Sequence, residues 1–248
     1  MGDVKSSYKD FARVSANRGL RCRNLSVMDF IHAVWTPAGA GPHPTLIALH
    51  GHGAHCQDLA PLAPLLADGQ LQVICPQAEF RLEGAPYSYS PMYTWMRRGA
   101  NDRPIDGELA RVATALSEFI SAVCERYQVD TRRPALMGFS QGGSLAYRLA
   151  LSEPHRWQGA AMLSTWLSDE AADDVHPDAA DLPLLVQHGI NDPLVEIERG
   201  RNSRDRLQAM RMNLDYREYP MQHEIGRQSM HDLSAWLSKL LLDSGAGD

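Results

Sequence analysis

The sequence has no apolar run long enough to cross a membrane and no short apolar segment near its start of the kind that directs secretion. We therefore expect a cytoplasmic protein without stable membrane insertion. Basic residues form no block, and the formal net charge of the chain is −6. Because nucleic acids are bound through clustered positive charge, we expect no nucleic-acid partner.

Cysteine is also scarce, and internal repeats and low-complexity tracts are absent. The four cysteines, at positions 22, 56, 75 and 124, form no Cys-x-x-Cys pair, so we expect reduced thiols. Hydrophobic residues make up 44% of the 248 residues, enough for a sizeable core. We expect one domain over residues 1–248, with a loose lead-in over 1–23 and a flexible tail over 243–248. A homodimer is left open.

Strand-like and helix-like segments alternate along the chain. Strands are expected near residues 45–50, 71–75, 134–139, 159–163, 184–188 and 214–219, after one or two strands within 24–36. Helical periodicity covers about 57–67, 105–127, 141–152, 194–212 and 227–242. This alternation predicts an α/β fold whose mostly parallel central sheet has about 7–8 strands and helices on both faces.

The segment Gly138-Phe139-Ser140-Gln141-Gly142 fits the pattern Gly-x-Ser-x-Gly between an apolar strand and a helix. A sharp strand-to-helix turn at a serine pushes the hydroxyl out of the fold, and flanking glycines relieve the crowding of that turn. The N–H groups at the helix start then face whatever the serine attacks. The context favours Ser140 as a catalytic nucleophile over a serine in an ordinary glycine-rich turn.

A serine nucleophile needs a base, and the base needs an acidic partner that orients it. Asp192 and His223 each lie on a loop that follows a predicted strand, and they come after Ser140 in the order Ser, Asp, His. Three candidates thus fall at the carboxyl ends of strands, where α/β sheets place their sites. Alternatively, Asp192 is only a turn former before a proline.

The other acidic and histidine candidates near this site are weaker. Glu224 would have to fold back onto its neighbour His223, and His188 ends a buried strand like a packed structural histidine. His231 lies in a helical segment and His155 and His176 lie in polar loops, so we expect these three at the surface.

An oxyanion hole is expected from the N–H of Gln141, after the nucleophile, and from the loop after the 45–50 strand, where His52 stands between two glycines. The histidines at positions 50, 52 and 55 also permit a metal cluster. No carboxylate pattern supports that alternative, so we expect neither a metal nor another cofactor.

Two connections, 78–104 and 164–183, are longer than ordinary loops between strand and helix. Trp166 and Leu167 begin the second connection, and Trp95 lies in the first among several tyrosines, so these three residues are predicted to contact substrate. The alternative is that the aromatic residues only pack the loops. Neither connection is long enough for a full cap domain, which predicts an open groove.

These motifs resemble the phospholipase/carboxylesterase family of α/β-hydrolases, which includes the acyl-protein thioesterases. The resemblance rests on His50-Gly51-His52-Gly53, Gly138-Phe139-Ser140-Gln141-Gly142-Gly143, Leu163-Ser164-Thr165-Trp166-Leu167, His188-Gly189-Ile190-Asn191-Asp192-Pro193 and His223-Glu224, between about residues 44 and 242. It implies an α/β-hydrolase fold, Ser140 as nucleophile, Asp192 as orienting acid and His223 as base, with the N–H groups of His52 and Gln141 binding the oxyanion.

The chain departs from the family pattern at two places. Gln222 stands where the family usually has glycine before the catalytic histidine, and His52 replaces an apolar residue in the early loop. The resemblance implies a serine hydrolase of carboxylic esters or thioesters. An acyltransferase or cyclase with an amine or alcohol acceptor, a serine peptidase and a non-catalytic binding protein remain as alternatives.

Overall fold

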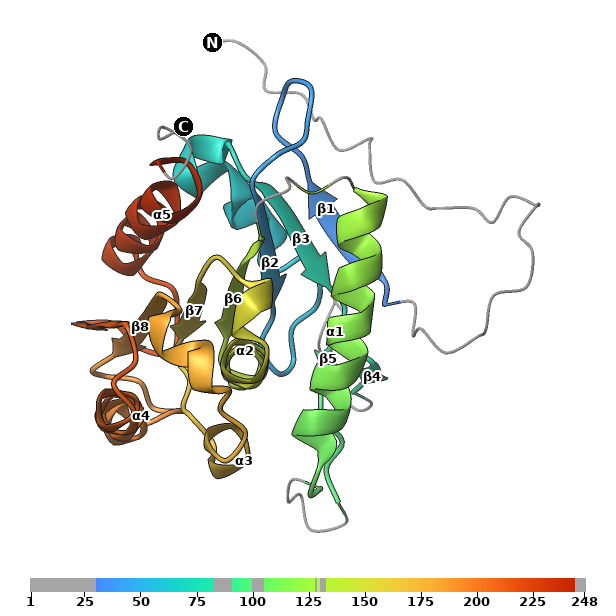
Figure 1. The fold of residues 1–248 in the computed structure, drawn as a ribbon. Helices are drawn as coiled ribbons and strands as arrows, with labels where there is room; N and C mark the ends of the chain where they lie inside the picture. The colour runs from blue at the N-terminus through green and yellow to red at the C-terminus, as the bar shows by residue number, and fades with distance from the viewer. Residues whose placement is uncertain (1–29, 83–90, 100–104, 128, 130–132, 244–248) are drawn as a thin grey trace, which may run out of the picture.

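The computed structural model describes residues 30–82, 91–99, 105–127, 129 and 133–243, and its centre is a seven-stranded sheet of order β1-β3-β2-β6-β7-β8-β9 (Figure 1). Only β1 runs antiparallel to its neighbour; the other pairs are parallel. The predicted α/β class is confirmed. The strands are β1 (His32–Trp35), β2 (Thr45–Leu49), β3 (Gln72–Pro76), β6 (Ala135–Phe139), β7 (Ala160–Leu163), β8 (Leu184–Gly189) and β9 (Leu214–Tyr219).

The central strands are apolar on both faces because helices cover both faces. Every residue of β2, β7 and β8 is buried, as expected of parallel strands inside an α/β fold. Strand β9 lies at the sheet edge, is mostly half-buried and carries Asp215, Arg217 and Glu218. Charged side chains on an edge strand discourage pairing with another chain.

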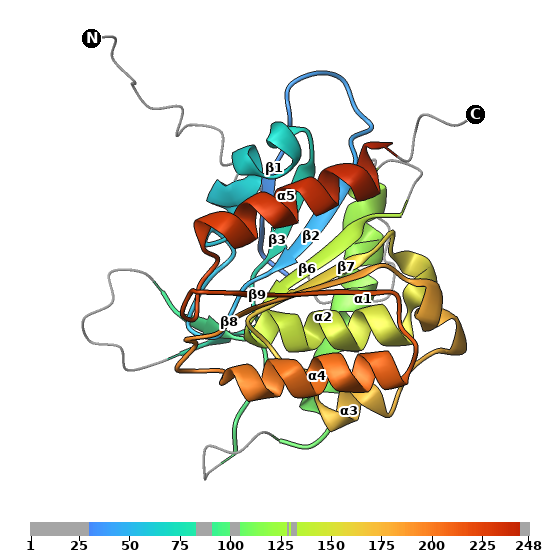
Figure 2. The same cartoon turned by 90° about the vertical axis from the view of Figure 1, so that its left-hand side faces the viewer.

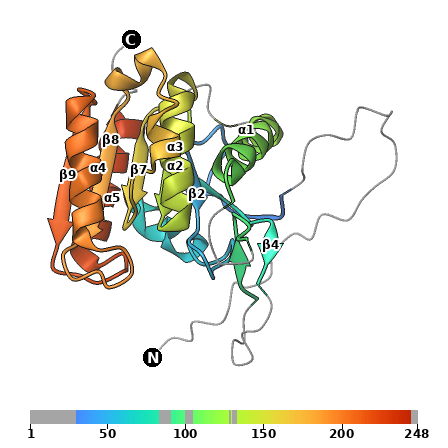
Figure 3. The same ribbon diagram turned by 90° about the horizontal axis from the view of Figure 1, so that it is seen from below.

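The helices form one layer on each side of the sheet (Figures 2 and 3). On one side lie α1, α2, α3 and α4, whose buried residues share a core with Ile47 and Leu49 of β2. On the other side α5 packs with Leu46 and Ala48, the alternate residues of the same strand. The helices are α1 (Glu108–Arg126), α2 (Gln141–Ser152), α3 (Asp169–Ala172), α4 (Ile197–Ala209) and α5 (Arg227–Leu241).

The predicted helix at 57–67 was wrong. The chain there forms two short 3₁₀ turns, Ala60–Leu65 and Ala67–Gly69. Pro61 and Pro64 lie in the first turn, and proline lacks the N–H that an α-helix needs. Two further elements were not expected: α3, and a small hairpin of β4 (Phe80–Arg81) and β5 (Tyr93–Thr94).

Several sequence predictions fall outside the described residues. These are the lead-in over 1–23, the tail beyond residue 243 and part of the 78–104 connection. Cys22 also lies outside, whereas Cys56, Cys75 and Cys124 are free thiols. Among the helices that the structure describes, none combines the length and apolar character required to cross a bilayer.

Candidate active site

Five neighbouring parallel strands end at the same edge of the sheet, and each is followed by one predicted site residue. In sheet order, β2 leads to His52, β6 to Ser140, β7 to Trp166, β8 to Asp192 and β9 to His223. All of these except Asp192 line one cavity of about 830 Å³. The parallel sheet therefore brings together residues that are up to 171 positions apart in the chain.

Ser140 lies at the turn from β6 into α2 with φ 52° and ψ −117°, a backbone conformation that is strained for a residue with a side chain. A Cβ atom at Gly138 would lie 2.2 Å from the carbonyl oxygen of Gly142, and one at Gly142 would lie 2.2 Å from that of Leu49. Only glycine fits at either position. The two glycines therefore permit the strained turn that brings Ser140 to the cavity.

Asp192 and His223 form a direct pair. Nδ1 of His223 donates to Oδ2 of Asp192 over 2.7 Å, and Oδ1 accepts the N–H groups of Leu194 and Val195 at 2.9 Å each. Burial alone raises the pKa of the Asp192 carboxyl, but the bonds from Val195, His223 and Leu194 outweigh burial and hold the pKa below its usual value. Asp192 is therefore ionised at neutral pH and fixes the His223 tautomer that leaves Nε2 able to accept a proton.

The loops that carry this pair are joined to each other. The N–H of Ile190 donates to the carbonyl of Tyr219 over 2.9 Å, and that of Asn191 donates to Met221 over 3.1 Å. A Cβ at Gly189 would lie 2.4 Å from the carbonyl oxygen of Met221. The close approach of the two loops places Asp192 within reach of His223.

His223 also lies beside the nucleophile turn. Its ring centroid is 4.9 Å from that of Phe139, the residue before Ser140. Within the residues that the structure describes, no hydrogen bond joins the Ser140 hydroxyl to His223. The hydrogen bond between a catalytic serine and its base is often long until substrate binds. Ser140 and His223 line the same cavity, which places the two side chains on one substrate-accessible surface.

The competing candidates lie near the Asp192–His223 pair but bind other groups, although Nε2 of His188 is 3.7 Å from Oδ2 of Asp192. Glu224 is exposed, and its carboxylate accepts the N–H of Gln222 over 3.4 Å. His188 is fully buried and donates from Nε2 to the carbonyl of Val195 over 2.7 Å, which makes it a structural histidine beneath the Asp192 loop. The histidines at positions 155, 176 and 231 are exposed, as predicted.

Gln141, the first residue of α2, has a backbone N–H with no carbonyl partner inside its helix. The oxygen of its buried side-chain amide accepts the N–H of Trp95 at 2.9 Å and the hydroxyl of Thr94 at 3.1 Å. Trp95 in turn donates its indole Nε1–H to the carbonyl of His50 over 2.8 Å. The segment Tyr93–Trp95 therefore links the start of α2 to the loop after β2.

The same segment positions the loop that contains His52. The N–H of Gly53 donates to the carbonyl of Tyr93 over 2.8 Å, and the N–H of Tyr93 donates to Ala54 over 3.0 Å. Both predicted oxyanion donors, His52 and Gln141, are thus attached to one short segment. The arrangement can supply N–H groups to a developing negative charge beside Ser140.

His50 is buried, and both ring nitrogens are occupied. Nε2 accepts the N–H of Ala78 over 3.1 Å, so Nδ1 carries the proton and donates to the carbonyl of Gly51 over 2.8 Å. Burial lowers the pKa of His50 to about 4. With neither nitrogen available as a ligand, the alternative of a metal bound by His50, His52 and His55 does not fit the structure.

The predicted substrate contacts divide into two groups. Trp166 is half-buried and lines the cavity. Trp95 has no exposed surface and Leu167 only 3%, and neither lines the cavity. Trp95 packs against Phe30 and His50, and Leu167 belongs to the core on the α2 side of the sheet. The prediction of direct substrate contact by Trp95 and Leu167 therefore needs correction: both are buried by packing.

Sequence reasoning missed several residues of the cavity wall. Arg199 lies in the predicted 194–212 helix, and Leu59 and Leu62 lie in the 57–67 segment, where the predicted helix does not form. No local pattern marks them, because they reach the cavity only through the packing of distant segments. The lining residues include Leu59, Leu62, Met96, Arg97, Arg98, Phe139, Trp166, Leu194, Val195, Arg199 and Ile225.

Known proteins resemble this chain in sequence and in fold. An acyl-protein thioesterase 1 of Mycosarcoma maydis is 26% identical over 229 residues, covering 82% of this chain and 94% of the relative. A probable carboxylesterase of Oryza sativa subsp. japonica is 32% identical over 107 residues, 42% of this chain and 40% of the relative.

Among solved structures, a Bacillus cereus carboxylesterase has a TM-score of 0.71 at 20% identity, covering 86% of this chain and 96% of its own. Zea mays acyl-protein thioesterase 2 has a TM-score of 0.66 at 23% identity, covering 85% and 99%. At these identities the likeness establishes the α/β-hydrolase fold. The sequence model described as Phospholipase/Carboxylesterase matches residues 32–241, and the chain therefore belongs to the phospholipase/carboxylesterase family.

Proposed function

We propose that this protein is a serine hydrolase that cleaves carboxylic esters or thioesters through an acyl-enzyme on Ser140. Membership of the phospholipase/carboxylesterase family supports ester or thioester hydrolysis. The observation that carries the proposal of a mechanism is the 2.7 Å bond between His223 and Asp192 at the cavity that Ser140 lines.

Each group has a defined role in the proposed reaction. Nε2 of His223 takes the proton of the Ser140 hydroxyl as Oγ attacks the acyl carbonyl, and Asp192 stabilises the imidazolium that forms. The N–H groups of His52 and Gln141 bind the tetrahedral oxyanion. His223 then protonates the leaving alcohol or thiol, and it activates a water molecule that releases the acid from Ser140.

The test is the variant Ser140→Ala. Loss of a triad nucleophile costs on the order of 10³–10⁶ in kcat, so turnover of 4-nitrophenyl butyrate should be abolished while the melting temperature is retained. Ser152→Ala, at the other end of α2 and outside the cavity, is the matched control and should behave as wild type.

A fluorophosphonate probe provides a second readout. Peptide mapping should find the label on Ser140 in wild type and none in the Ser140→Ala variant. Activity within tenfold of wild type in that variant would remove Ser140 from the mechanism. Product analysis with a competing alcohol or amine separates hydrolysis from acyl transfer.

A further inference from the structure

The cavity beside Ser140 is basic although the protein is acidic. Arg97, Arg98 and Arg199 line it together with one carboxylate, Asp58, whereas the whole chain has a formal net charge of −6. The carboxylate of Asp58 lies 3.2 Å from Nε2 of His55. When His55 is protonated, its positive charge offsets the negative charge of Asp58. The charge of the cavity wall therefore favours an anion.

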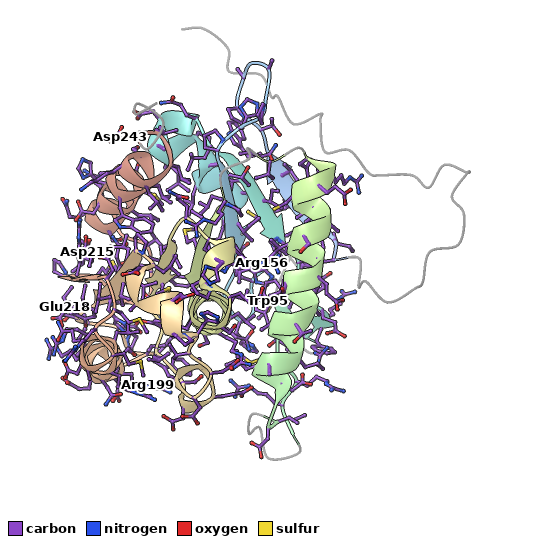
Figure 4. All side chains as sticks on the ribbon, in the orientation of Figure 1. Trp95, Arg156, Arg199, Asp215, Glu218 and Asp243 are labelled. Carbon is purple, nitrogen blue, oxygen red and sulfur yellow. The ribbon has the colours of Figure 1, made fainter. Side chains whose placement is uncertain are left out.

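Arg199 is fixed over an aromatic ring at the cavity wall. It projects from the first turn of α4 (Figure 4), and its guanidinium carbon lies 3.5 Å from the ring centroid of Trp166. A guanidinium stacks well on an aromatic face, and the stack restrains a side chain that is otherwise flexible. Partial burial lowers the pKa of Arg199, yet an arginine remains charged at neutral pH.

The charge of Arg199 has no carboxylate bound to it within the part of the chain that the structure describes. Glu196, one turn earlier, only attracts it from a distance. Arg97, which also lines the cavity, is paired with Glu108 at 2.7 Å. The other three arginines of α4 likewise have partners: Arg201 with Glu218 at 2.9 Å, Arg204 with Asp205 at 2.8 Å and Arg206 with Asp169 at 2.9 Å.

We propose that the substrates of this enzyme are esters or thioesters that carry an anionic group, a carboxylate or a phosphate, and that Arg199 binds this group. The inference rests on the function proposed above. A stacked, partly desolvated guanidinium presents its N–H groups in a planar fork that matches the oxygens of either anion. Because Trp166 already orients the fork, little side-chain entropy is lost when the anion binds.

The rest of the wall indicates that the anionic group is attached to an apolar body. Leu59, Leu62, Met96 and Ile225 line the same cavity. An acyl or alcohol part buried against these side chains gains about 0.8 kcal/mol for each CH₂. The substrate class is therefore amphiphilic, with a scissile bond at Ser140, an apolar segment and a negative charge at Arg199.

The test compares substrates that differ only in charge. Mono-4-nitrophenyl glutarate and 4-nitrophenyl pentanoate have acyl chains of the same length. The first chain ends in a carboxylate and the second in a methyl group. A second pair, 4-carboxyphenyl butyrate and 4-carbamoylphenyl butyrate, places it on the leaving group. The quantity measured is the ratio of kcat/KM between the charged and the neutral member of each pair, so a general effect of a mutation cancels.

We expect Arg199→Met to lower this ratio by about tenfold in one of the two pairs, as loss of a charge-assisted hydrogen bond predicts. The pair affected identifies the side of the scissile bond that carries the anion. Arg199→Lys should restore part of the ratio, because it keeps the charge and loses the fork. Arg204→Met removes a charge from the same helix outside the cavity and should leave both ratios unchanged.

An unchanged ratio in both pairs for Arg199→Met would overturn the inference, and so would an equal fall in Arg204→Met, because long-range charge would then explain the effect. Either result leaves the proposed function intact as long as the neutral esters are hydrolysed and Ser140 is labelled. If wild type hydrolyses no member of either pair and takes up no fluorophosphonate, the proposed function itself fails.

Discussion

Trp95→Phe tests whether a fully buried side chain positions the oxyanion loop. The change removes the indole donor to the carbonyl of His50, now 2.8 Å away. An unpaired buried carbonyl costs about 1–3 kcal/mol. The lost ring volume of roughly 40 Å³ adds about 1 kcal/mol at about 24 cal/mol per Å³. We therefore expect the free energy of unfolding to fall by about 2–4 kcal/mol.

The same change should lower kcat. The His50 carbonyl is two residues before His52, whose N–H is a proposed oxyanion donor. Losing one such donor completely costs about 10²–10³ in kcat, so partial displacement should cost about ten- to a hundredfold. Trp157→Phe is the matched control: Trp157 is equally buried, and its indole donates to the carbonyl of Leu149 over 3.2 Å, away from the cavity.

The assays are urea unfolding and turnover of 4-nitrophenyl esters of increasing acyl length. We expect similar stability losses in the two tryptophan variants, with kcat reduced only in Trp95→Phe and its acyl-length profile unchanged. Equal kcat in both variants would refute the positioning role. A changed length profile would instead return Trp95 to the substrate-binding surface.

Three further predictions follow from the geometry. Asp192→Asn should abolish the acylation burst while Glu224→Gln keeps it, and His188→Ala should lower stability rather than acylation; a normal burst in Asp192→Asn would contradict the pairing with His223. Trp166→Ala should flatten the dependence of kcat/KM on the acyl length of neutral esters, since burial contributes about 0.8 kcal/mol per CH₂; loss of stability with an unchanged profile would show that the ring only packs its loop. For His50, whose pKa falls from 6.5 to about 4 on folding, the contribution of the neutral buried ring is complete above pH 6.5 and is lost as pH falls toward about 4. The free energy of unfolding should therefore drop by about 3 kcal/mol more in wild type than in His50→Asn between pH 7 and 4, as measured by urea unfolding at each pH; parallel pH profiles would exclude His50 as the titrating group.

The sequence by itself determined the fold and the set of loops that meet at the site. Apolar runs as short as four residues, separated by segments of helical periodicity, fit few folds other than a parallel sheet with helices on both faces. In such a sheet all strands end at one edge, so residues on the loops after them must converge. The sequence prediction failed at 57–67, although Pro61 and Pro64 stand there and disfavour the continuous helix that was predicted.

Only the tertiary structure decided which side chains of those loops face the cavity. Trp95 and Trp166 are the same residue type on comparable loops, yet Trp95 is buried because its indole and backbone N–H find His50 and Gln141. Trp166 stays at the cavity wall, where Arg199 covers its ring. These partners are 33–46 positions away in the chain. No local periodicity records such contacts, because they depend on how whole helices and loops pack against the sheet.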